Sequence, residues 1–224
     1  NRFSGRSEHS KFSEKDLQVL FEQKNLNFNS KKISSLKLES NLFYILKSSK
    51  NPAFAFFNGG SNKMELVEKS NYYGIQPRNS EQAFALHAIM NPSIRLVTLT
   101  GVAGTGKTLL ALAGSLEQRR DFKQIYLARP IVPLSNRDIG FLPGDAEQKI
   151  NPYMQPLWDN LKFIKNQFGE RDRNYKRIEE MVTNEKILVT ALAYRRGRSL
   201  SNIMFIVDEA HKFTHQQLKR KLTK

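Results

Sequence analysis

An eight-residue stretch near the middle of this chain restricts the possible folds more than any other part of the sequence. It reads Gly-Val-Ala-Gly-Thr-Gly-Lys-Thr at 101–108. The stretch matches G-x-x-x-x-G-K-[ST] at every fixed position, with an apolar run at 96–100 before it and a helix-forming run at 107–118 after it. A strand, a glycine-rich loop and a helix in this order form a cradle for phosphate. A glycine turn with a purely structural role would not require Lys and Thr at its end. We therefore expect an α/β fold with a P-loop and a parallel sheet.

Each residue type in this loop has a physical reason to be there. Gly101, Gly104 and Gly106 lack a Cβ, so their backbone can turn N–H groups toward phosphate oxygens. Lys107 can neutralise the β and γ phosphates as a point charge, and the Thr108 hydroxyl can bind Mg²⁺. The other predicted nucleotide contacts are Val102, Ala103, Thr105 and Leu109.

A second motif lies at 205–210, where the apolar run Phe-Ile-Val is followed by Asp208 and Glu209. This is the pattern of a Walker B strand, in which Asp208 would complete the Mg²⁺ shell and Glu209 would orient and polarise the attacking water. The alternative is a pair of solvated acids at the end of a strand. A doubled acid favours hydrolysis over phosphate transfer to an acceptor, so the predicted catalytic residues are Lys107, Asp208 and Glu209.

Gln82 lies about twenty residues before the loop and has two interpretations. Asn79 and Gln82 have the spacing of an N-x-x-Q capping pair at the start of a helix. The Gln82 amide also carries the donor and the acceptor that an adenine edge requires. The residues alone leave both interpretations open.

Hydrophobic patterning divides the chain into three regions. Residues 1–37 are expected to form a tether with a short helix, 38–70 a small β unit, and 71–224 an incomplete P-loop domain. The helix of the tether would place Leu17, Leu20 and Phe21 on one face. In the P-loop domain we expect strands at 96–100, 124–128, 186–192 and 203–207, and helices at 79–90, 107–118, 146–168, interrupted by prolines, and 175–183. Apolar strands joined by helices predict a parallel sheet covered on both faces.

Composition excludes several other classes of protein. The chain has no cysteine, so disulfide scaffolds and thiolate metal sites are excluded, and its four histidines do not have zinc-hydrolase spacing. No run of about 20 apolar residues and no signal peptide is visible, so a cytoplasmic location is expected. The 36 Lys and Arg residues against 21 Asp and Glu give a net charge of +15. This charge fits a nucleic-acid partner or simply a lysine-rich surface.

Several further blocks occur in a fixed order around the two motifs. They are Arg-Pro-Ile-Val-Pro at 129–133, Asp-Ile-Gly-Phe-Leu-Pro-Gly-Asp at 138–145, Asn-Pro-Tyr-Met-Gln-Pro at 151–156, Trp-Asp-Asn at 158–160 and Arg-Gly-Arg-Ser-Leu at 196–200. With the two motifs, residues 72–224 resemble the PhoH-like ATPases. The resemblance implies a RecA-type core, ATP and Mg²⁺ as ligands, and an adenine role for Gln82. Residues 74–82 resemble the arm of the family that is fused to a PIN ribonuclease domain and acts on RNA.

Two departures from the family pattern stand out. The family usually continues its Walker B acids with Gln-Asn, whereas this chain has His211 and Lys212. The chain also stops about fifteen residues after Glu209, before the strand that would carry a polar sensor residue and before a distant arginine. We therefore interpret it as a fragment cut at both ends. Related ATPases complete one another's sites, so a homo-oligomer is expected by analogy.

Basic residues follow two of the expected strands at their carboxyl ends, the edge where open α/β sheets place their ligands. Arg129 follows the strand at 124–128, and the strand at 186–192 is followed by Arg195, Arg196 and Arg198. Arg129 could reach phosphate or nucleic acid, and the three guanidinium groups at 195–198 suit contacts to phosphodiesters of single-stranded RNA. A solvated run of charge is the alternative.

The sequence as a whole therefore predicts an ATP-binding and ATP-hydrolysing domain that couples turnover to RNA binding or helicase-like remodelling. Two other classes remain open at this stage. One is a nucleotide-dependent interaction module with little turnover. The other is a plain nucleic-acid-binding domain.

Overall fold

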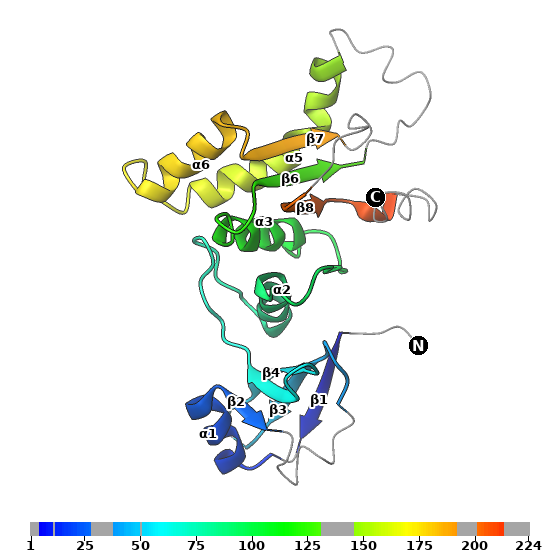
Figure 1. Cartoon of the computed structure of the whole chain (residues 1–224), viewed down its shortest axis with the longest axis vertical. Coiled ribbons are helices and arrows are strands. Elements are labelled where there is room, and N and C mark those ends of the chain that lie inside the picture. Colours follow the sequence, from blue (N-terminus) through cyan, green and yellow to red (C-terminus); the bar gives the residue numbers. More distant parts are fainter. Residues whose placement is uncertain are drawn as a thin grey trace. The chain divides into compact units, whose positions relative to one another are not determined.

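A computed structural model describes residues 5–10, 12–27, 38–49, 51–130, 146–191 and 201–212 (Figure 1). The chain divides into two compact units. The first contains residues 1–70 and 77–87, and the second contains residues 71–76 and 88–224. No helix of the described ranges is long and apolar enough to cross a membrane.

The first unit is built on a five-stranded sheet with the order β1-β3-β4-β5-β2. Its elements are β1 (Arg6–Ser10), α1 (Glu14–Gln23), β2 (Asn25–Asn27), β3 (Phe43–Lys47), β4 (Ala53–Asn58), β5 (Lys63–Leu66) and the start of α2 (Ser80–Met90). β1 runs parallel to β3, and the other neighbours are antiparallel. At the β4–β5 turn the Asn58 side chain accepts hydrogen bonds from the N–H groups of Gly60 and Ser61, which fixes the hairpin.

Apolar side chains cover both faces of the central strand β3, because alternate residues point to opposite sides. On one face, Tyr44 and Leu46 lie in a core that also includes Leu17 and Leu20 of α1. On the other, Phe43 stacks on Phe84 of α2, with ring centroids 4.7 Å apart. The sheet is therefore held between two helices.

The structure of the first unit differs from the sequence-based expectations in three respects. Within the region expected to be a tether, the described residues 6–10 and 25–27 form β1 and β2, which pair as the outer strands of the sheet. Residues 80–87 of α2 also cluster with this unit rather than with the P-loop region. Phe21, predicted on the apolar face of α1, is 43% exposed, whereas Leu20 is fully buried. The apolar face of the helix is thus narrower than its sequence suggests.

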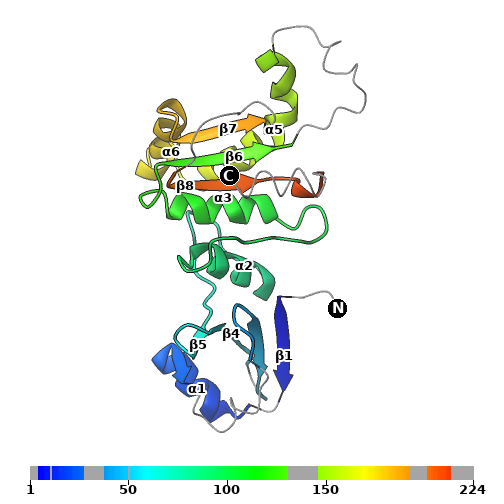
Figure 2. The same cartoon turned by 45° about the vertical axis from the view of Figure 1, so that its right-hand side comes forward.

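The second unit contains a three-stranded parallel sheet with the order β7-β6-β8. Its elements are α3 (Lys107–Glu117), β6 (Gln124–Arg129), α5 (Ala146–Lys165), α6 (Arg173–Thr183), β7 (Ile187–Ala191), β8 (Ile203–Val207) and the 3₁₀ turn η2 (Ala210–Lys212). Figure 2 shows the three strands running in the same direction, with α3 alongside. Helix α5 packs against α3 and β7 and continues through Pro152 and Pro156, so the expected interruption is absent.

The strands β6, β7 and β8 confirm three of the four predicted for the P-loop region. In the register, Ala128 of β6 lies opposite Thr190 of β7 and Val207 of β8. The central strand β6 is buried from Ile125 to Ala128, as a strand with neighbours on both sides should be. Because the strands are parallel, all three carboxyl ends lie at one edge of the sheet.

The fourth predicted strand, at 96–100, was wrong: these residues lie outside the strands and Leu96 is 66% exposed. Apolar residues give such a segment strand propensity, but a strand exists only through hydrogen bonds to a neighbour. Among the described residues, β8 pairs with β6 alone. The residues before the P-loop therefore form no strand ladder among the described residues.

Candidate functional site

The glycine-rich loop ends in an uncapped helix start. Gly106 is the N-cap of α3, with φ 82° and ψ 15°, and no side chain accepts a hydrogen bond from the first turn. Gly104 also has a positive φ, 78°, and a Cβ at this position would meet open space. The left-handed backbone turns successive N–H groups to one side, which leaves the positive end of the helix dipole open to an anion.

Lys107 bends back over the loop. Its Nζ donates to the carbonyl oxygens of Gly101 at 3.1 Å and Val102 at 2.8 Å, and lies 3.3 Å from Oγ1 of Thr105. The Thr105 hydroxyl in turn donates to the Val102 carbonyl. Residues 101–105, which include Ala103, are exposed, and residues 106–109, which include Leu109, are partly buried. The ammonium group thus lies among the loop residues where a phosphate is expected.

The first Walker B acid meets the loop directly. Oγ1 of Thr108 donates to Oδ1 of Asp208 at 2.7 Å, although the two residues are one hundred positions apart. The Asp208 N–H donates to the Ala128 carbonyl, which continues the β6–β8 ladder past the end of β8 and fixes the carboxylate at the sheet edge. The Asp208 side chain is only 15% exposed.

This pair of oxygens fits a magnesium ion. A hydroxyl and a carboxylate are the hard ligands that Mg²⁺ prefers, and Mg²⁺ normally takes few protein ligands and keeps waters or phosphate oxygens. No group of three or more His, Cys, Asp or Glu side chains suited to a metal occurs in the described part of the chain. A site that depends on nucleotide phosphates for its remaining ligands agrees with this.

Glu209, the second acid, lies between two nitrogen-bearing side chains. Its Oε1 is 3.7 Å from Nη2 of Arg129, and its Oε2 is 3.1 Å from Nε2 of His211. Glu209 itself has a left-handed backbone, with φ 55°, a conformation that costs free energy for any residue with a Cβ. The turn holds the carboxylate beside Asp208 instead of extending the strand.

Arg129 and His211 are contacts of the acids that the sequence did not predict. Arg129 was expected to reach phosphate or nucleic acid. In the structure its Nε lies 3.8 Å from Oδ2 of Asp208, and its side chain is 18% exposed. His211 was noted only as a departure from the family pattern. Adjacent parallel strands bring their carboxyl ends together, so the position of Arg129 after β6 was a usable signal. The predicted contacts Arg195, Arg196 and Arg198 lie outside the described residues.

Gln82 has the geometry of the capping interpretation. Its N–H donates to Oδ1 of Asn79 at 2.9 Å, and its Oε1 accepts from the N–H of Arg78 at 2.8 Å. The two side chains thus satisfy backbone groups at the start of α2 reciprocally. This arrangement accounts for the Asn79–Gln82 spacing without a ligand.

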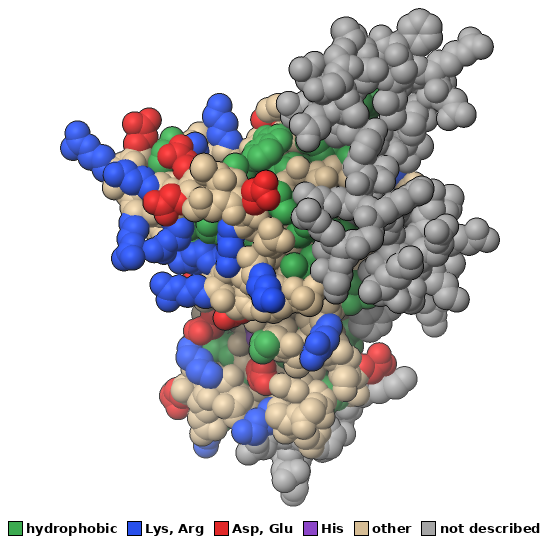
Figure 3. All heavy atoms as spheres, turned by 45° about the horizontal axis from the view of Figure 1, so that its top comes forward, with side chains coloured by type: hydrophobic (Ala, Val, Ile, Leu, Met, Phe, Trp, Pro, Cys, Tyr) green, Lys and Arg blue, Asp and Glu red, His purple; other side chains and the backbone are tan. Residues whose placement is uncertain are grey.

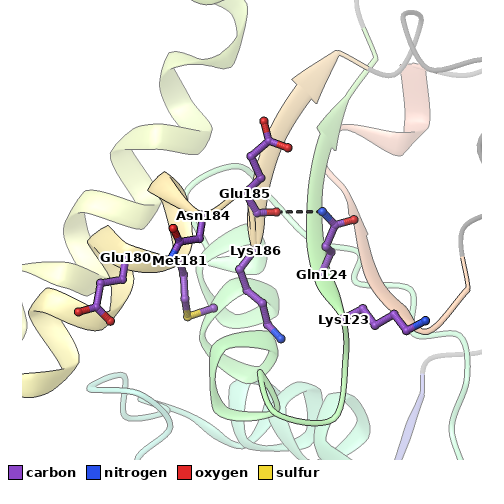
Figure 4. Close-up of a pocket in the computed structure, with 7 residues that line it drawn as sticks. All are labelled: Lys123, Gln124, Glu180, Met181, Asn184, Glu185 and Lys186. Carbon is purple, nitrogen blue, oxygen red and sulfur yellow. Dashed lines mark hydrogen bonds between the residues drawn. The ribbon is translucent and has the colours of Figure 1, made fainter.

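A hollow of about 320 Å³ lies at the opposite edge of the parallel sheet (Figure 4). It is lined by residues that begin β6 and β7 and end α6: Lys123, Gln124, Glu180, Met181, Asn184, Glu185 and Lys186. The side-chain amide of Gln124 donates to the Glu185 carbonyl across it. The hollow is at the amino ends of the strands, so it is separate from the phosphate loop and the paired acids.

A parallel α/β sheet with an uncapped glycine-rich loop and a Walker B acid bonded to its Thr108 defines a P-loop NTPase-type domain. Residues 74–224 match the family described as PhoH-like protein, and the chain belongs to this family. The resemblance seen in the sequence is thereby confirmed, together with the α/β fold class.

Similar proteins carry the same family name. The chain is 44% identical over 167 residues to the protein PhoH2 of Bacillus subtilis, covering 72% of this chain and 36% of that protein. It is 36% identical over 141 residues to PhoH2 of Thermobispora bispora, covering 62% and 30%. It is 42% identical over 126 residues to a PhoH-like protein of Synechocystis, covering 55% and 36%. The chain thus spans about a third of the length of these relatives.

Proposed function

We propose that this chain binds ATP with Mg²⁺, hydrolyses the ATP, and couples turnover to the binding or remodelling of RNA. The observation that carries the proposal is the 2.7 Å hydrogen bond between Thr108 and Asp208. It brings the phosphate loop and the acid pair into one site, as P-loop chemistry requires. Neither motif has this meaning alone.

The residues have separate roles in this proposal. The backbone N–H groups of 101–108 would surround the phosphates, and Lys107 would exchange its loop carbonyls for phosphate oxygens. Thr108 and Asp208 would hold Mg²⁺, which supplies charge neutralisation for the transferring phosphate. Glu209 would orient a water molecule and polarise its O–H bond.

A phosphate-release assay with purified protein tests the enzyme claim. Lys107→Ala should weaken ATP binding and turnover together, whereas Glu209→Gln should keep ATP binding but lower turnover by about 10²-fold or more. Lys123→Ala and Glu185→Gln are matched controls at the opposite edge of the sheet, and Glu185 has nearly the same backbone φ as Glu209, 53° against 55°. Equal turnover in the wild type and both site variants would contradict the proposal. Tight ATP binding without phosphate release would favour a nucleotide-dependent interaction module instead.

The RNA part of the proposal is supported by the net charge of +15 and by the sequence resemblance to the RNA-acting arm of the family. On the face shown in Figure 3, Lys and Arg side chains lie together with Asp and Glu side chains. Single-stranded RNA should bind with an affinity that falls steeply with salt. Replacing Arg195, Arg196 and Arg198 together by Ala should reduce the slope of log affinity against log salt. RNA binding that ignores both ATP and these substitutions would favour a plain nucleic-acid binder.

Gln82 is also proposed to contact adenine, beyond its capping role. Gln82→Glu separates the two roles, because a carboxylate can still accept from the Arg78 N–H but lacks the amide donor. An adenine contact predicts weaker ATP binding with unchanged thermal stability. A pure capping role predicts unchanged ATP affinity and unchanged preference for ATP over GTP.

Partners of the longer protein are proposals as well, since the chain spans about a third of its relatives. We propose a homo-oligomer in which one subunit completes the site of the next, a PIN ribonuclease domain elsewhere in the protein, and a cytoplasmic location. Light scattering of the longer protein with and without ATP tests the assembly. Sequencing of the flanking coding region tests the PIN domain.

A further inference from the structure

Arg129 is the residue of the site that neither motif explains. It ends β6, the central strand, and its guanidinium lies near two carboxylates, 3.8 Å from Asp208 and 3.7 Å from Glu209. The side chain is mostly buried, at 18% exposure, so its position is restricted. The pairing of Ala128 with Val207 places the next position of each strand, Arg129 and Asp208, side by side.

The positive charge of Arg129 affects how strongly Asp208 can bind a metal ion. Oδ1 of Asp208 accepts from Thr108, while Oδ2 faces Arg129. A cation at this distance from the carboxylate repels a divalent ion that would share it, and partial burial weakens the screening by water. Arg129 therefore opposes Mg²⁺ at Asp208.

The same guanidinium group helps to orient the carboxylate of the second acid, Glu209. Glu209 is partly exposed, and an unrestrained glutamate side chain would sample several rotamers. Arg129 on one carboxylate oxygen and His211 on the other define where the carboxylate lies. The fork of an arginine can reach both acids at once, which a single ammonium group cannot.

We propose that Arg129 is a positioning residue that weakens the hold of Asp208 on Mg²⁺ and at the same time keeps Glu209 oriented for hydrolysis. This inference deepens the proposed function and depends on it. A residue at the end of β6 would thus influence both the Mg²⁺ dependence of nucleotide binding and the rate of ATP hydrolysis.

The test separates charge from geometry with two variants, Arg129→Gln and Arg129→Lys. The first readout is the affinity for a fluorescent, non-hydrolysable ATP analogue with and without Mg²⁺. Arg129→Gln should raise the ratio of these two affinities about fivefold, because the repelling charge is gone. Arg129→Lys should keep the ratio within about twofold of wild type, because the charge remains.

The second readout is turnover. Both variants should lower kcat about tenfold, since neither side chain holds both carboxylates, while KM for ATP with Mg²⁺ does not rise. A general loss of structure would lower kcat, but it would not raise the ratio of the nucleotide affinities with and without Mg²⁺. In an Asp208→Asn background, Arg129→Gln should leave the affinity ratio unchanged. Arg120→Gln, an exposed arginine outside the site, is the control.

Two failures can be told apart. A wild-type protein whose nucleotide affinity ignores Mg²⁺ would overturn the proposed function and this inference with it. A clear wild-type Mg²⁺ effect that Arg129→Gln leaves unchanged or reduces would overturn the role of Arg129 alone. Unchanged kcat in both variants would likewise remove its role in orienting Glu209.

Discussion

The two sheets of this chain use their polar groups differently. In the first unit, charged side chains pair at the surface, as Lys47 does with Glu8, and aromatic rings fill the space between β3, β4 and α2. In the second unit, polar side chains from separate elements converge at one sheet edge, where Thr108 meets Asp208. The first arrangement serves stability. The second places two acids, Asp208 and Glu209, at neighbouring positions of one sheet edge, with Arg129 near both.

Helix starts show the same contrast. α2 begins with a capping side chain, Asn79, and α6 begins with Asp172, which accepts from the N–H of Asn174. α3 begins at Gly106 without any side-chain cap. A cap satisfies the free N–H groups of a first turn, so its absence leaves these groups available for a ligand. The helix start without a side-chain cap therefore points to a ligand site, whereas the two capped starts do not.

Phe56→Ala should cause the greatest loss of stability, because it removes a ring from the aromatic core of the first unit. Phe56 is 1% exposed, and its ring lies 5.1 Å from Phe43 and 5.0 Å from His87. Its removal should lower the free energy of unfolding of the first unit by about 3–5 kcal/mol. Hydrogen exchange should accelerate in β3 and β4 peptides and stay slow in β6 peptides. The exposed Phe21→Ala is the control, and equal acceleration in both units would contradict the division of roles.

The next effect is expected from Thr108→Ala in the second unit. Loss of the hydroxyl should weaken Mg²⁺-dependent nucleotide binding by about 10- to 100-fold, because the metal loses a ligand and Oδ1 of Asp208 loses its hydrogen bond from Thr108. Unfolding followed by the fluorescence of Trp158, the only tryptophan, should change little. Thr108→Ser keeps the hydroxyl and should restore binding. A large loss of stability without loss of binding would show that the contact is structural.

Asn79→Ala should have a smaller effect. The Asn79 side chain accepts from the N–H of Gln82, and loss of a helix cap costs about 1 kcal/mol. Urea unfolding of the purified protein would measure it. Asn79→Asp, which keeps the acceptor, should cost much less. A cost as large as that of Phe56→Ala would mean that the cap does more than satisfy the helix start.

The smallest effect concerns pH. Burial among aromatic rings lowers the pKa of His87, and the charge of Glu65 opposes this only in part. The unfolded chain therefore takes up a proton first as the pH falls. The stabilisation is present above the ordinary histidine value of about 6.5 and is lost as the pH falls through the lower folded pKa. Urea midpoints at pH 7.5 and 5.5 should differ less in His87→Phe than in wild type, and an equal difference would contradict this role.

The parts that the sequence predicted are those coded locally. The Gly101–Thr108 pattern and the apolar runs of β6, β7 and β8 each lie in one short stretch, so their structure follows from composition and spacing. β1 reads Arg-Ser-Glu-His-Ser and carries no apolar pattern, so only its pairing with β3 makes it a strand. The strand predicted at 96–100 was wrong for the opposite reason: these residues have an apolar pattern but pair with no strand among the described residues.

The candidate site divides in the same way. Lys107, Thr108 and Asp208 could be predicted because phosphate and metal chemistry restricts the residue types at fixed spacing. The contacts of Arg129 and His211 with Glu209 depend on which strands become neighbours and on a left-handed turn. The neighbouring residues in the sequence determine neither the strand order nor this turn. The sequence therefore placed Arg129 and His211 near the site but did not predict which groups they contact.

The inward-bent ammonium of Lys107 has a consequence for selectivity. Its Nζ donates to the carbonyl oxygens of Gly101 and Val102, so an anion that binds this lysine has to replace these hydrogen bonds. A ligand must compete with these carbonyl oxygens for the ammonium group. A polyphosphate can do so because it carries several anionic oxygens. Selectivity for polyphosphates over other anions would then begin at Lys107, before the base or the sugar of a nucleotide makes any contact.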